Sequence, residues 1–252
     1  MSHWKERSRA AGIHLAASVL VALLAAALVF LVWYPYPYRE ASGGRELFTL
    51  IVAIDVIVGP LLTFAVFNLK KPMKELRRDL LIVVLLQLGA LGYGLWTVYS
   101  ARPVHLVFEI DRFQTVHAIE VDADLLKKAP PALRVIPLLG PTLLAVRPFK
   151  DANESGEATM AALGGVSLSS RPDLWEEYEA AKPRVRAEAK PATTLLTRFP
   201  KQAPKIQKAV AETGRPLDKL AFVPMKSRMQ FWTVLLDAQT MDVVGFIDLD
   251  SF

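Results

Sequence analysis

The sequence contains no cysteine among its 252 residues, and it has only four histidines. The absence of cysteine excludes disulfides, zinc–thiolate sites and thiol nucleophiles, so every folded part must be held by its core alone. Glycine-rich phosphate loops and the short motifs of hydrolases and metalloproteases are also missing. Because no residues assemble a nucleophile, a base and an oxyanion donor, we expect no enzyme, no catalytic residues, no metal site and no cofactor.

Charged side chains are scarce in the first hundred residues, apart from a few basic clusters. The formal net charge is +5, yet residues 101–252 hold 20 Lys and Arg against 19 Asp and Glu. The positive excess therefore lies beside apolar segments, where basic residues indicate membrane topology more often than a nucleic-acid site. We expect a lipid bilayer and no nucleic acid as a partner.

Three apolar runs are long enough to cross a bilayer, which takes about 20 residues of helix. They cover residues 12–34, 47–67 and 80–99. The first run is too long for a cleaved signal peptide, and it ends in an aromatic cluster that suits the headgroup layer. We therefore expect a transmembrane domain of three helices in residues 1–100.

The distribution of Lys and Arg predicts how these helices are oriented. The N-terminus is basic, and the loop from Pro35 to Glu46 is charge-balanced. The turn after the second run carries five basic residues, Lys70, Lys71, Lys74, Arg77 and Arg78. By the positive-inside rule, the N-terminus and this turn face the cytoplasm. Residues 101–252 then lie outside it.

Residues 101–252 have the pattern of a compact α+β domain with β-hairpins at its two ends. Alternating apolar positions predict a first hairpin with its turn at Asp111-Arg112 and position 106 opposite 117. His105 and His117 then point to opposite faces, which argues against a shared metal. The remaining predicted elements are a helix capped by Asp122, strands at 142–146, 231–236 and 243–249, helices at 157–163, 172–181 and 204–212, and an exposed connector or frayed helix at 182–191.

Asp55 is the only acidic residue inside the three apolar runs. A carboxylate at membrane depth costs roughly 2.5–3.5 kcal/mol, so it should face protein or water and have a partner. Gln87 and Tyr93 lie at a similar depth, and Gly59-Pro60 should kink the helix and free backbone carbonyls. Two interpretations stay open, an aspartate that holds the helices together and a docking point for a polar or cationic group of another membrane helix.

The second run and its basic turn contain a distinctive pattern. It comprises Asp55, Gly59-Pro60-Leu61-Leu62-Thr63, Phe67-Asn68, Lys71-Pro72 and Glu75-Leu76-Arg77-Arg78-Asp79. This pattern resembles the type IV pilin accessory proteins (the TfpX/TfpZ group), over about the first 120 residues. The resemblance implies a multi-pass protein of the bacterial inner membrane with its C-terminal domain in the periplasm. It also implies a chaperone-like role in which the protein binds a cognate type IV pilin, the major subunit, and assists its stability or its assembly into pili.

Two alternatives to a pilin-binding protein remain. A membrane-anchored periplasmic sensor should have a ligand cleft with converging polar groups in the outer domain. A pilin-modification (glycosylation) factor needs a sugar–lipid site, and no such motif is visible. The resemblance also leaves open which pilin is bound and whether the pilus assembly machinery is a partner.

Overall fold

The computed structural model describes residues 2–252, and Met1 and the side chains of Ser2 and His3 lie outside that description. The chain divides into two compact units. The first comprises Met1–Tyr36 and Gly44–Ala101, and the second comprises Pro37–Gly43 and Arg102–Phe252. The short segment between the first two long helices thus belongs to the second unit.

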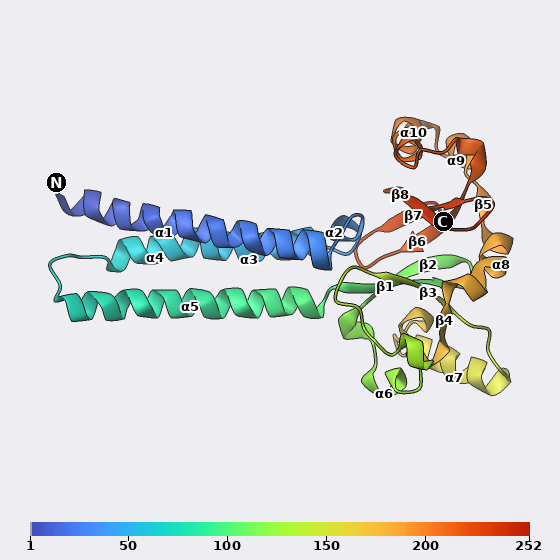
Figure 1. Ribbon diagram of the computed structural model, residues 1–252, viewed down its shortest axis with the longest axis horizontal. Helices are drawn as coiled ribbons and strands as arrows, with labels where there is room; N and C mark the ends of the chain where they lie inside the picture. Colours follow the sequence, from blue (N-terminus) through green and yellow to red (C-terminus); the bar gives the residue numbers. More distant parts are fainter. Residues whose placement is uncertain (1) are drawn as a thin grey trace. The chain divides into compact units, whose positions relative to one another are not determined.

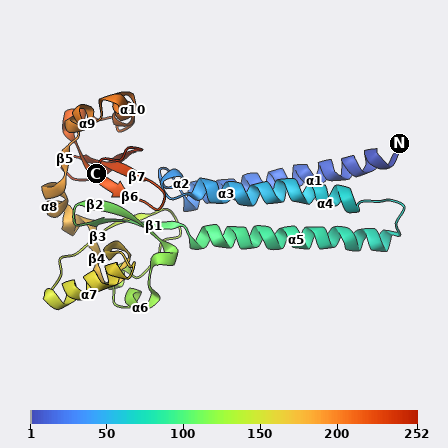
Figure 2. The same ribbon diagram turned by 180° about the vertical axis from the view of Figure 1, so that it is seen from behind.

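The first unit consists of three long helices that run side by side (Figures 1 and 2). They extend over Trp4–Trp33, Gly44–Val66 and Met73–Ser100, and each is long and apolar enough to cross a membrane. Most of their large apolar side chains are exposed, as is typical of helices that are surrounded by lipid. The three apolar helices predicted from the sequence are therefore present.

Two of the three helices contain π-helical turns. The first is α1 (Ser2–Ala27), which continues into η1 (Leu28–Trp33). The second is built from α3 (Gly44–Ala53), η2 (Ile54–Val58) and α4 (Gly59–Val66). The third, α5 (Met73–Ser100), is regular throughout. The π turn η2 falls in the middle of the second helix, where such turns often mark a functional site.

Close packing of small residues holds the three helices together at one end. The ring of Tyr34 lies directly over Gly44, and its hydroxyl donates a hydrogen bond to the carbonyl of Val98 at 3.2 Å. A Cβ on Gly94 would lie only 2.8 Å from the side chain of Ile51. Glycine at these two positions therefore allows neighbouring helices to approach closely.

The second unit is built on one mixed sheet, which has eight strands within the described residues. The strands are β1 (Pro103–Glu109), β2 (Arg112–His117), β3 (Thr142–Val146), β4 (Trp175–Glu177), β5 (Lys190–Pro191), β6 (Leu220–Lys226), β7 (Phe231–Asp237) and β8 (Val243–Ile247). Their order is β4-β3-β1-β2-β6-β7-β8, and β5 pairs with β6. The β1–β3 and β2–β6 pairs are parallel, and the other pairs are antiparallel.

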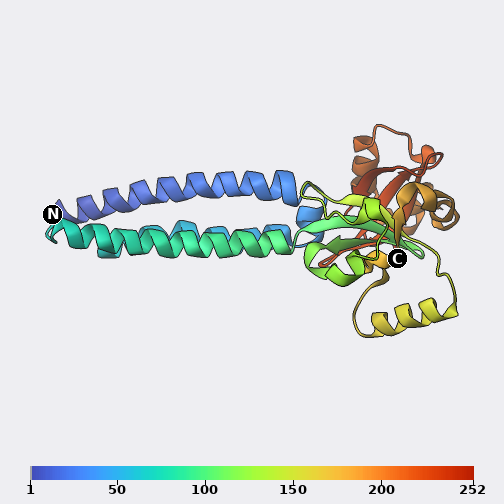
Figure 3. The same ribbon diagram turned by 60° about the horizontal axis from the view of Figure 1, so that its bottom comes forward.

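Helices cover both faces of this sheet. On one face, α2 (Tyr38–Ala41) and α8 (Tyr178–Glu188) pack on a single large cluster of buried side chains. The other face carries two clusters, one under α9 (Thr193–Arg198) and α10 (Ala203–Glu212) and one that includes Ala158 of α7 (Ala152–Leu163). Figure 3 shows α7 (yellow) at the edge of the unit, with long loops on both sides. The mixed α/β composition agrees with the prediction.

Several predicted elements are confirmed at their positions. Strand β3 and the final hairpin of β7 and β8 lie at the positions that the sequence predicted for them. Asp122 caps α6 (Ala123–Leu126) by accepting hydrogen bonds from the backbone of Asp124 and Leu125. Helix α10 ends just before Gly214, which adopts a positive φ of 65°.

The first hairpin has a different register from the predicted one. Its turn is Ile110-Asp111, with Ile110 at a φ of 54°, and Leu106 faces Thr115 instead of residue 117. The prediction was wrong because no glycine marks this turn, and apolar alternation does not detect a shift of two residues that leaves every side chain on its face. His105 and His117 still lie on opposite faces, as predicted.

Two regions of the second unit were also predicted incorrectly. Residues 172–181 contain a 3₁₀ turn, strand β4 and only the start of α8, and β4 forms because Trp175 to Glu177 pair with β3. Residues 182–191 are mostly exposed, as predicted, but 182–188 are ordered helix, since Ala181 and Val185 anchor α8 in the core. Tertiary pairing and packing, which local patterns do not contain, decide both cases.

Candidate functional site

The π turn η2 is the centre of the candidate site. In such a turn, the carbonyl of one residue accepts a hydrogen bond from the N–H five residues later. For Asp55 that residue is Pro60, which has no N–H. The amide Nε2 of Gln87 donates to the Asp55 carbonyl instead, at 3.0 Å. Gln87 therefore binds Asp55, as its depth in the third run suggested, but through the backbone and not through the carboxylate.

Gly59 makes room for this hydrogen bond. A Cβ placed on Gly59 would overlap the amide group of Gln87. Gly59 and Pro60 are both buried, whereas Asp55 is half-buried. The pair Gly59-Pro60 thus has two separate effects, since glycine admits the Gln87 side chain and proline leaves the carbonyl that this side chain binds.

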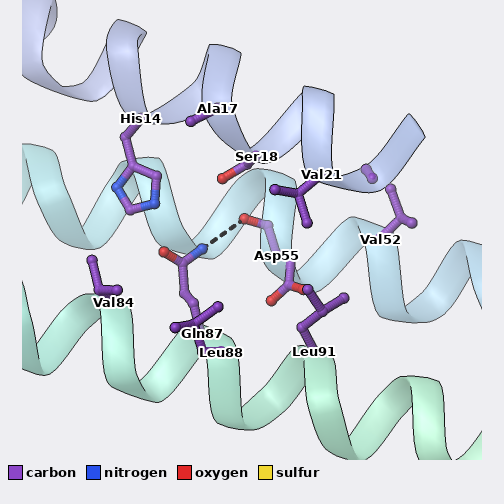
Figure 4. A pocket seen from close by; sticks show the side chains of 11 residues that line it. His14, Ala17, Ser18, Val21, Val52, Asp55, Val84, Gln87, Leu88 and Leu91 are labelled. Carbon is purple, nitrogen blue, oxygen red and sulfur yellow. Dashed lines mark hydrogen bonds between the residues drawn. The ribbon is translucent and has the colours of Figure 1, made fainter. Parts of the chain in front are cut away.

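A cavity of about 140 Å³ opens beside Asp55 among the three helices. Its lining residues are His14, Ala17, Ser18, Val21, Ala22, Val52, Asp55, Val84, Gln87, Leu88 and Leu91. Figure 4 shows His14 and Ser18 extending from α1 towards Gln87 and Asp55. The lining is mostly apolar, with these few polar groups gathered in one part of it. Such a volume accommodates a few water molecules or one polar side chain.

The carboxylate of Asp55 has no hydrogen-bonding or ion-pairing partner within residues 2–252. It also lines a second hollow, of about 270 Å³, between the second helix and α5. Tyr93 lines that hollow as well, but its side chain is exposed and makes no hydrogen bond to Asp55. Asp55 thus lies between two open spaces. Its carbonyl joins the second helix to α5 through Gln87, whereas its carboxylate points to no partner in the described residues.

His14, Ser18 and Thr63 belong to the site but were not predicted. The Nδ1 atom of His14 lies 2.5 Å from the hydroxyl oxygen of buried Thr63, which joins α1 to α4 next to the cavity. Part of the signal was present in the sequence, because a histidine inside an apolar run is rare and a serine there can form a hydrogen bond to another helix. Their spacing along the chain gives no indication that they meet Asp55 in space.

The basic turn covers the connection between α4 and α5 and the first two turns of α5, and it is mostly exposed. Lys71 pairs with Asp79 at 2.7 Å, and Arg78 lies 3.6 Å from the same carboxylate. Arg7 of α1 donates to the carbonyl of Phe67 at 2.8 Å, just before the turn. Lys70, Lys74 and Arg77 are exposed to the surroundings. The turn therefore has the surface that a topology-determining segment needs.

The second unit has a pocket of about 340 Å³ beside β1 and α8, with Arg147 and Arg184 at its rim. Arg147 forms two hydrogen bonds to Glu154, at 2.7 and 2.8 Å, and these lower the pKa of that carboxyl to about 2. Arg184 is paired with Glu176. Both arginines are thus already bound to carboxylates of the chain, and within residues 2–252 no group of three potential metal ligands comes together.

The fold and the site together define a class of protein with three potentially membrane-crossing helices, an acid-centred cavity among them and a mixed α/β unit. The family model "Fimbrial assembly protein FimB" matches residues 2–43. Two similar proteins of Dichelobacter nodosus are "Fimbrial assembly protein, serogroup I", 38% identical, and the serogroup E1 protein, 36% identical. Each alignment covers 97% of this chain and 96% of the relative.

A third relative, "Fimbrial assembly protein, serogroups C1 and C2", is 43% identical over 48% of this chain and 93% of its own length. No solved structure matches the chain. The chain belongs to the family of fimbrial assembly proteins, which confirms the resemblance to type IV pilus accessory proteins.

Proposed function

We propose that this chain is an accessory protein of the bacterial inner membrane that binds a cognate type IV pilin and assists its assembly, without catalysis. The support is the function for which its relatives are named, fimbrial assembly, and their similarity along nearly the whole chain. The three apolar helices supply the membrane domain. The distribution of Lys and Arg favours a cytoplasmic basic turn and a periplasmic second unit.

The observation that carries the proposal is the unpartnered carboxylate of Asp55 between two open hollows. Asp55 is eight residues after Leu47, where the apolar run begins, which corresponds to about 12 Å of helix. It is therefore near the middle of a hydrocarbon core of about 30 Å. An acid at this depth needs a polar partner or water, and no residue of the described part of the chain forms a hydrogen bond or an ion pair with its carboxylate.

The surface of α5 beside the site suits a further helix. A Cβ placed on Gly89 or Gly92 would meet nothing within 4 Å, unlike one on Gly94, which would meet Ile51. Ala90 and Tyr93 line the hollow next to Asp55. Small residues without neighbours let another membrane helix approach closely, and interhelical hydrogen bonds then stabilise the contact.

A pilin provides such a helix, since the resemblance implies a subunit that waits in the inner membrane as one apolar helix with a polar head outside. In the proposed complex, a polar or cationic group of the pilin helix enters the cavity and binds the Asp55 carboxylate. The second unit lies on the same side as the pilin head and can cover it through strand edges or surface patches.

The test is recovery of the pilin with variants of the full-length protein in detergent. We expect Asp55→Leu to lose most of the co-purified pilin and Asp55→Asn to retain part of it, because an amide still forms hydrogen bonds. Asp79→Asn is the matched control, since Asp79 lies in the basic turn region and is paired with Lys71. Unchanged recovery with a folded Asp55→Leu protein would make Asp55 a packing residue and remove this mechanism.

A further inference from the structure

Several apolar side chains of the second unit are exposed on loops that are hydrogen-bonded to residues next to the ends of the long helices. They are Ile119, Val135, Leu138, Leu139 and Met229, and each is at least 61% exposed. They come from three different loops, those around 119, 135–139 and 229. Large apolar side chains that are this exposed on several loops call for something that covers them.

Two of these loops are hydrogen-bonded to Arg102. The N–H of Ala118, next to Ile119, donates to the carbonyl of Arg102 at 2.9 Å. The guanidinium Nη2 of Arg102 donates to the carbonyl of Pro137 at 3.2 Å, and Pro137 precedes Leu138 and Leu139. Arg102 is only two residues beyond Ser100, the last residue of α5, a distance of at most about 7 Å.

The third loop is held near the start of the second long helix. The N–H of Met229 donates to the carbonyl of Ala41 at 3.1 Å, and Ser227 is hydrogen-bonded to Ser42 at 3.0 Å. Ala41 is three residues before Gly44, where α3 begins. All three loops are therefore tied to residues that directly precede or follow a membrane-length helix, whatever the orientation of the second unit as a whole.

The depth of α5 indicates where Arg102 lies. Its apolar part, from Leu80 to Tyr99, has 20 residues and therefore a length of about 30 Å, which matches the hydrocarbon core. Tyr99 then lies at the edge of the core, and Arg102 falls within the headgroup layer. The apolar loops that are hydrogen-bonded to Arg102 are within reach of the same layer.

We infer that the loops carrying Ile119, Val135, Leu138, Leu139 and Met229 insert into the lipid interface on the side of the membrane where α5 ends. This inference rests on the proposed membrane insertion of the three helices. Exposed Lys128 and Arg134 precede the apolar residues 135–139 in the chain, and basic groups beside apolar ones favour a surface of anionic headgroups. The loops hold the second unit against the bilayer, next to the point where a pilin helix leaves it.

The chain offers a matched control for this inference. Ile110 is 70% exposed, and Ile119 is 71% exposed. Ile110 lies at the turn of the β1–β2 hairpin, at the far end of β1 from Arg102, and seven strand residues extend over about 23 Å. The two isoleucines thus have the same chemistry and exposure, but only Ile119 lies next to a residue that is bonded to Arg102.

The absence of cysteine allows the test to use single cysteines in the full-length protein. Each variant, I119C, L139C, M229C, I110C or L86C, is labelled with an environment-sensitive fluorophore. The labelled protein is reconstituted into vesicles of phosphatidylethanolamine and phosphatidylglycerol that contain spin-labelled lipid. Leu86, an exposed residue within α5, reports whether the long helices are inserted.

We expect strong quenching by the spin-labelled lipid at positions 86, 119, 139 and 229, and none at position 110. Quenching at 86 without quenching at 119 and 139 would overturn the inference and leave the proposed membrane domain intact. The exposed apolar loops would then be better explained by contact with a protein partner. Equal quenching at 110 and 119 would also overturn it, because contact would not be specific to these loops. Absence of quenching at 86 would refute membrane insertion and this inference together.

Discussion

At the scale of single residues, the site depends on the missing N–H of Pro60 and on the missing side chain of Gly59. Without an N–H on Pro60, the π turn leaves the Asp55 carbonyl to Gln87, and without a side chain on Gly59, Gln87 fits against the second helix. The side-chain amide of Gln87 is thereby hydrogen-bonded to the backbone carbonyl of Asp55. The carboxylate of Asp55 stays available to a group from outside the chain.

Gly59→Ala should destabilise the first unit, because the new methyl group overlaps the amide of Gln87. We expect a loss of roughly 1–3 kcal/mol in the free energy of unfolding, as for other overpacked sites. The measurement is denaturant unfolding of the full-length protein in micelles. Gly92→Ala is the control, since its Cβ meets nothing within 4 Å, and it should be neutral or stabilising by up to about 1 kcal/mol.

A double-mutant cycle distinguishes the overlap between the Gly59→Ala methyl group and Gln87 from any other effect of alanine at position 59. In a Gln87→Ala background the group that Gly59→Ala displaces is gone, so the additional cost of Gly59→Ala should largely disappear. An undiminished cost in that background would show that Gly59 is required for a reason other than Gln87.

His105 should make the stability of the second unit depend on pH. Burial lowers the pKa of its imidazole from 6.5 to about 4, and its ring packs edge-on against Trp175 at 4.5 Å. In the unfolded chain the imidazole of His105 binds a proton below about pH 6.5, whereas in the folded chain it binds one only below about pH 4. The contribution of neutral His105 to the free energy of unfolding is therefore fully present above pH 6.5. It decreases by up to about 3 kcal/mol as the pH falls to about 4.

The variant His105→Phe keeps a ring against Trp175 but removes the titrating group. We expect it to flatten the dependence of the unfolding free energy on pH between about 4 and 6.5, measured by tryptophan fluorescence with increasing denaturant. The same slope in the variant and in the original protein would show that other groups control this pH range.

At the scale of elements, the short segment from Pro37 to Gly43 is part of the core of the second unit. Tyr38 is buried and its ring packs against Phe246 at 6.0 Å, while Ala41 and Ser42 bind the loop between β6 and β7. The connection between the first two long helices therefore completes the sheet's hydrophobic layer. Loss of this segment affects the folding of a unit that is otherwise encoded by Arg102–Phe252.

Tyr38→Ala should lower the stability of the second unit by about 3 kcal/mol, in the range found for large-to-small changes of buried aromatic residues. Tyr38→Phe is the matched control because it keeps the packing ring, and it should cost less than about 1 kcal/mol. The readout is the thermal unfolding of the full-length protein, followed in the near-ultraviolet circular dichroism. Equal stability of Tyr38→Ala and Tyr38→Phe would contradict a core role for the segment.

Element type was predictable from the sequence where one physical signal dominates. Length and continuous apolarity predict the three long helices, and two short apolar runs on either side of the polar stretch from Asp237 to Asp242 predict the hairpin of β7 and β8. Strand β6 was missed because it is buried on both faces, so its sequence from Leu220 to Met225 shows no alternation, and Pro224 argues against a central strand. Its place in the sheet is decided by long-range pairing with β2 and β7.

The candidate site was partly predictable for similar reasons. Asp55 and Gln87 stand out as polar residues in apolar runs, and Gly59-Pro60 stands out as a helix breaker. The pairing of His14 with Thr63 joins residues 49 positions apart, which no spacing rule reveals. Tyr93 was expected at the depth of Asp55, and it lines the same hollow, but its side chain is exposed and forms no hydrogen bond to Asp55.

At the scale of the whole molecule, the proposal depends on the sidedness of the three helices. The proposal puts the basic N-terminus and the basic turn on the cytoplasmic side, and Phe252 then lies in the periplasm. A reporter that is active only in the periplasm should therefore be active when fused after Phe252 and inactive when inserted at Lys70. The reverse pattern would place the second unit in the cytoplasm, away from the pilin head.

The most direct test of a pilin at the Asp55 cavity is photo-crosslinking in the cell from neighbouring positions of α5. Leu88 lines the cavity, whereas Leu86 has similar exposure and depth but lies outside both hollows. With a photoreactive residue at 88, we expect an adduct with the pilin that is absent from position 86 and is lost with Asp55→Leu. No pilin adduct from position 88, or equal adducts from 86 and 88, would contradict the account.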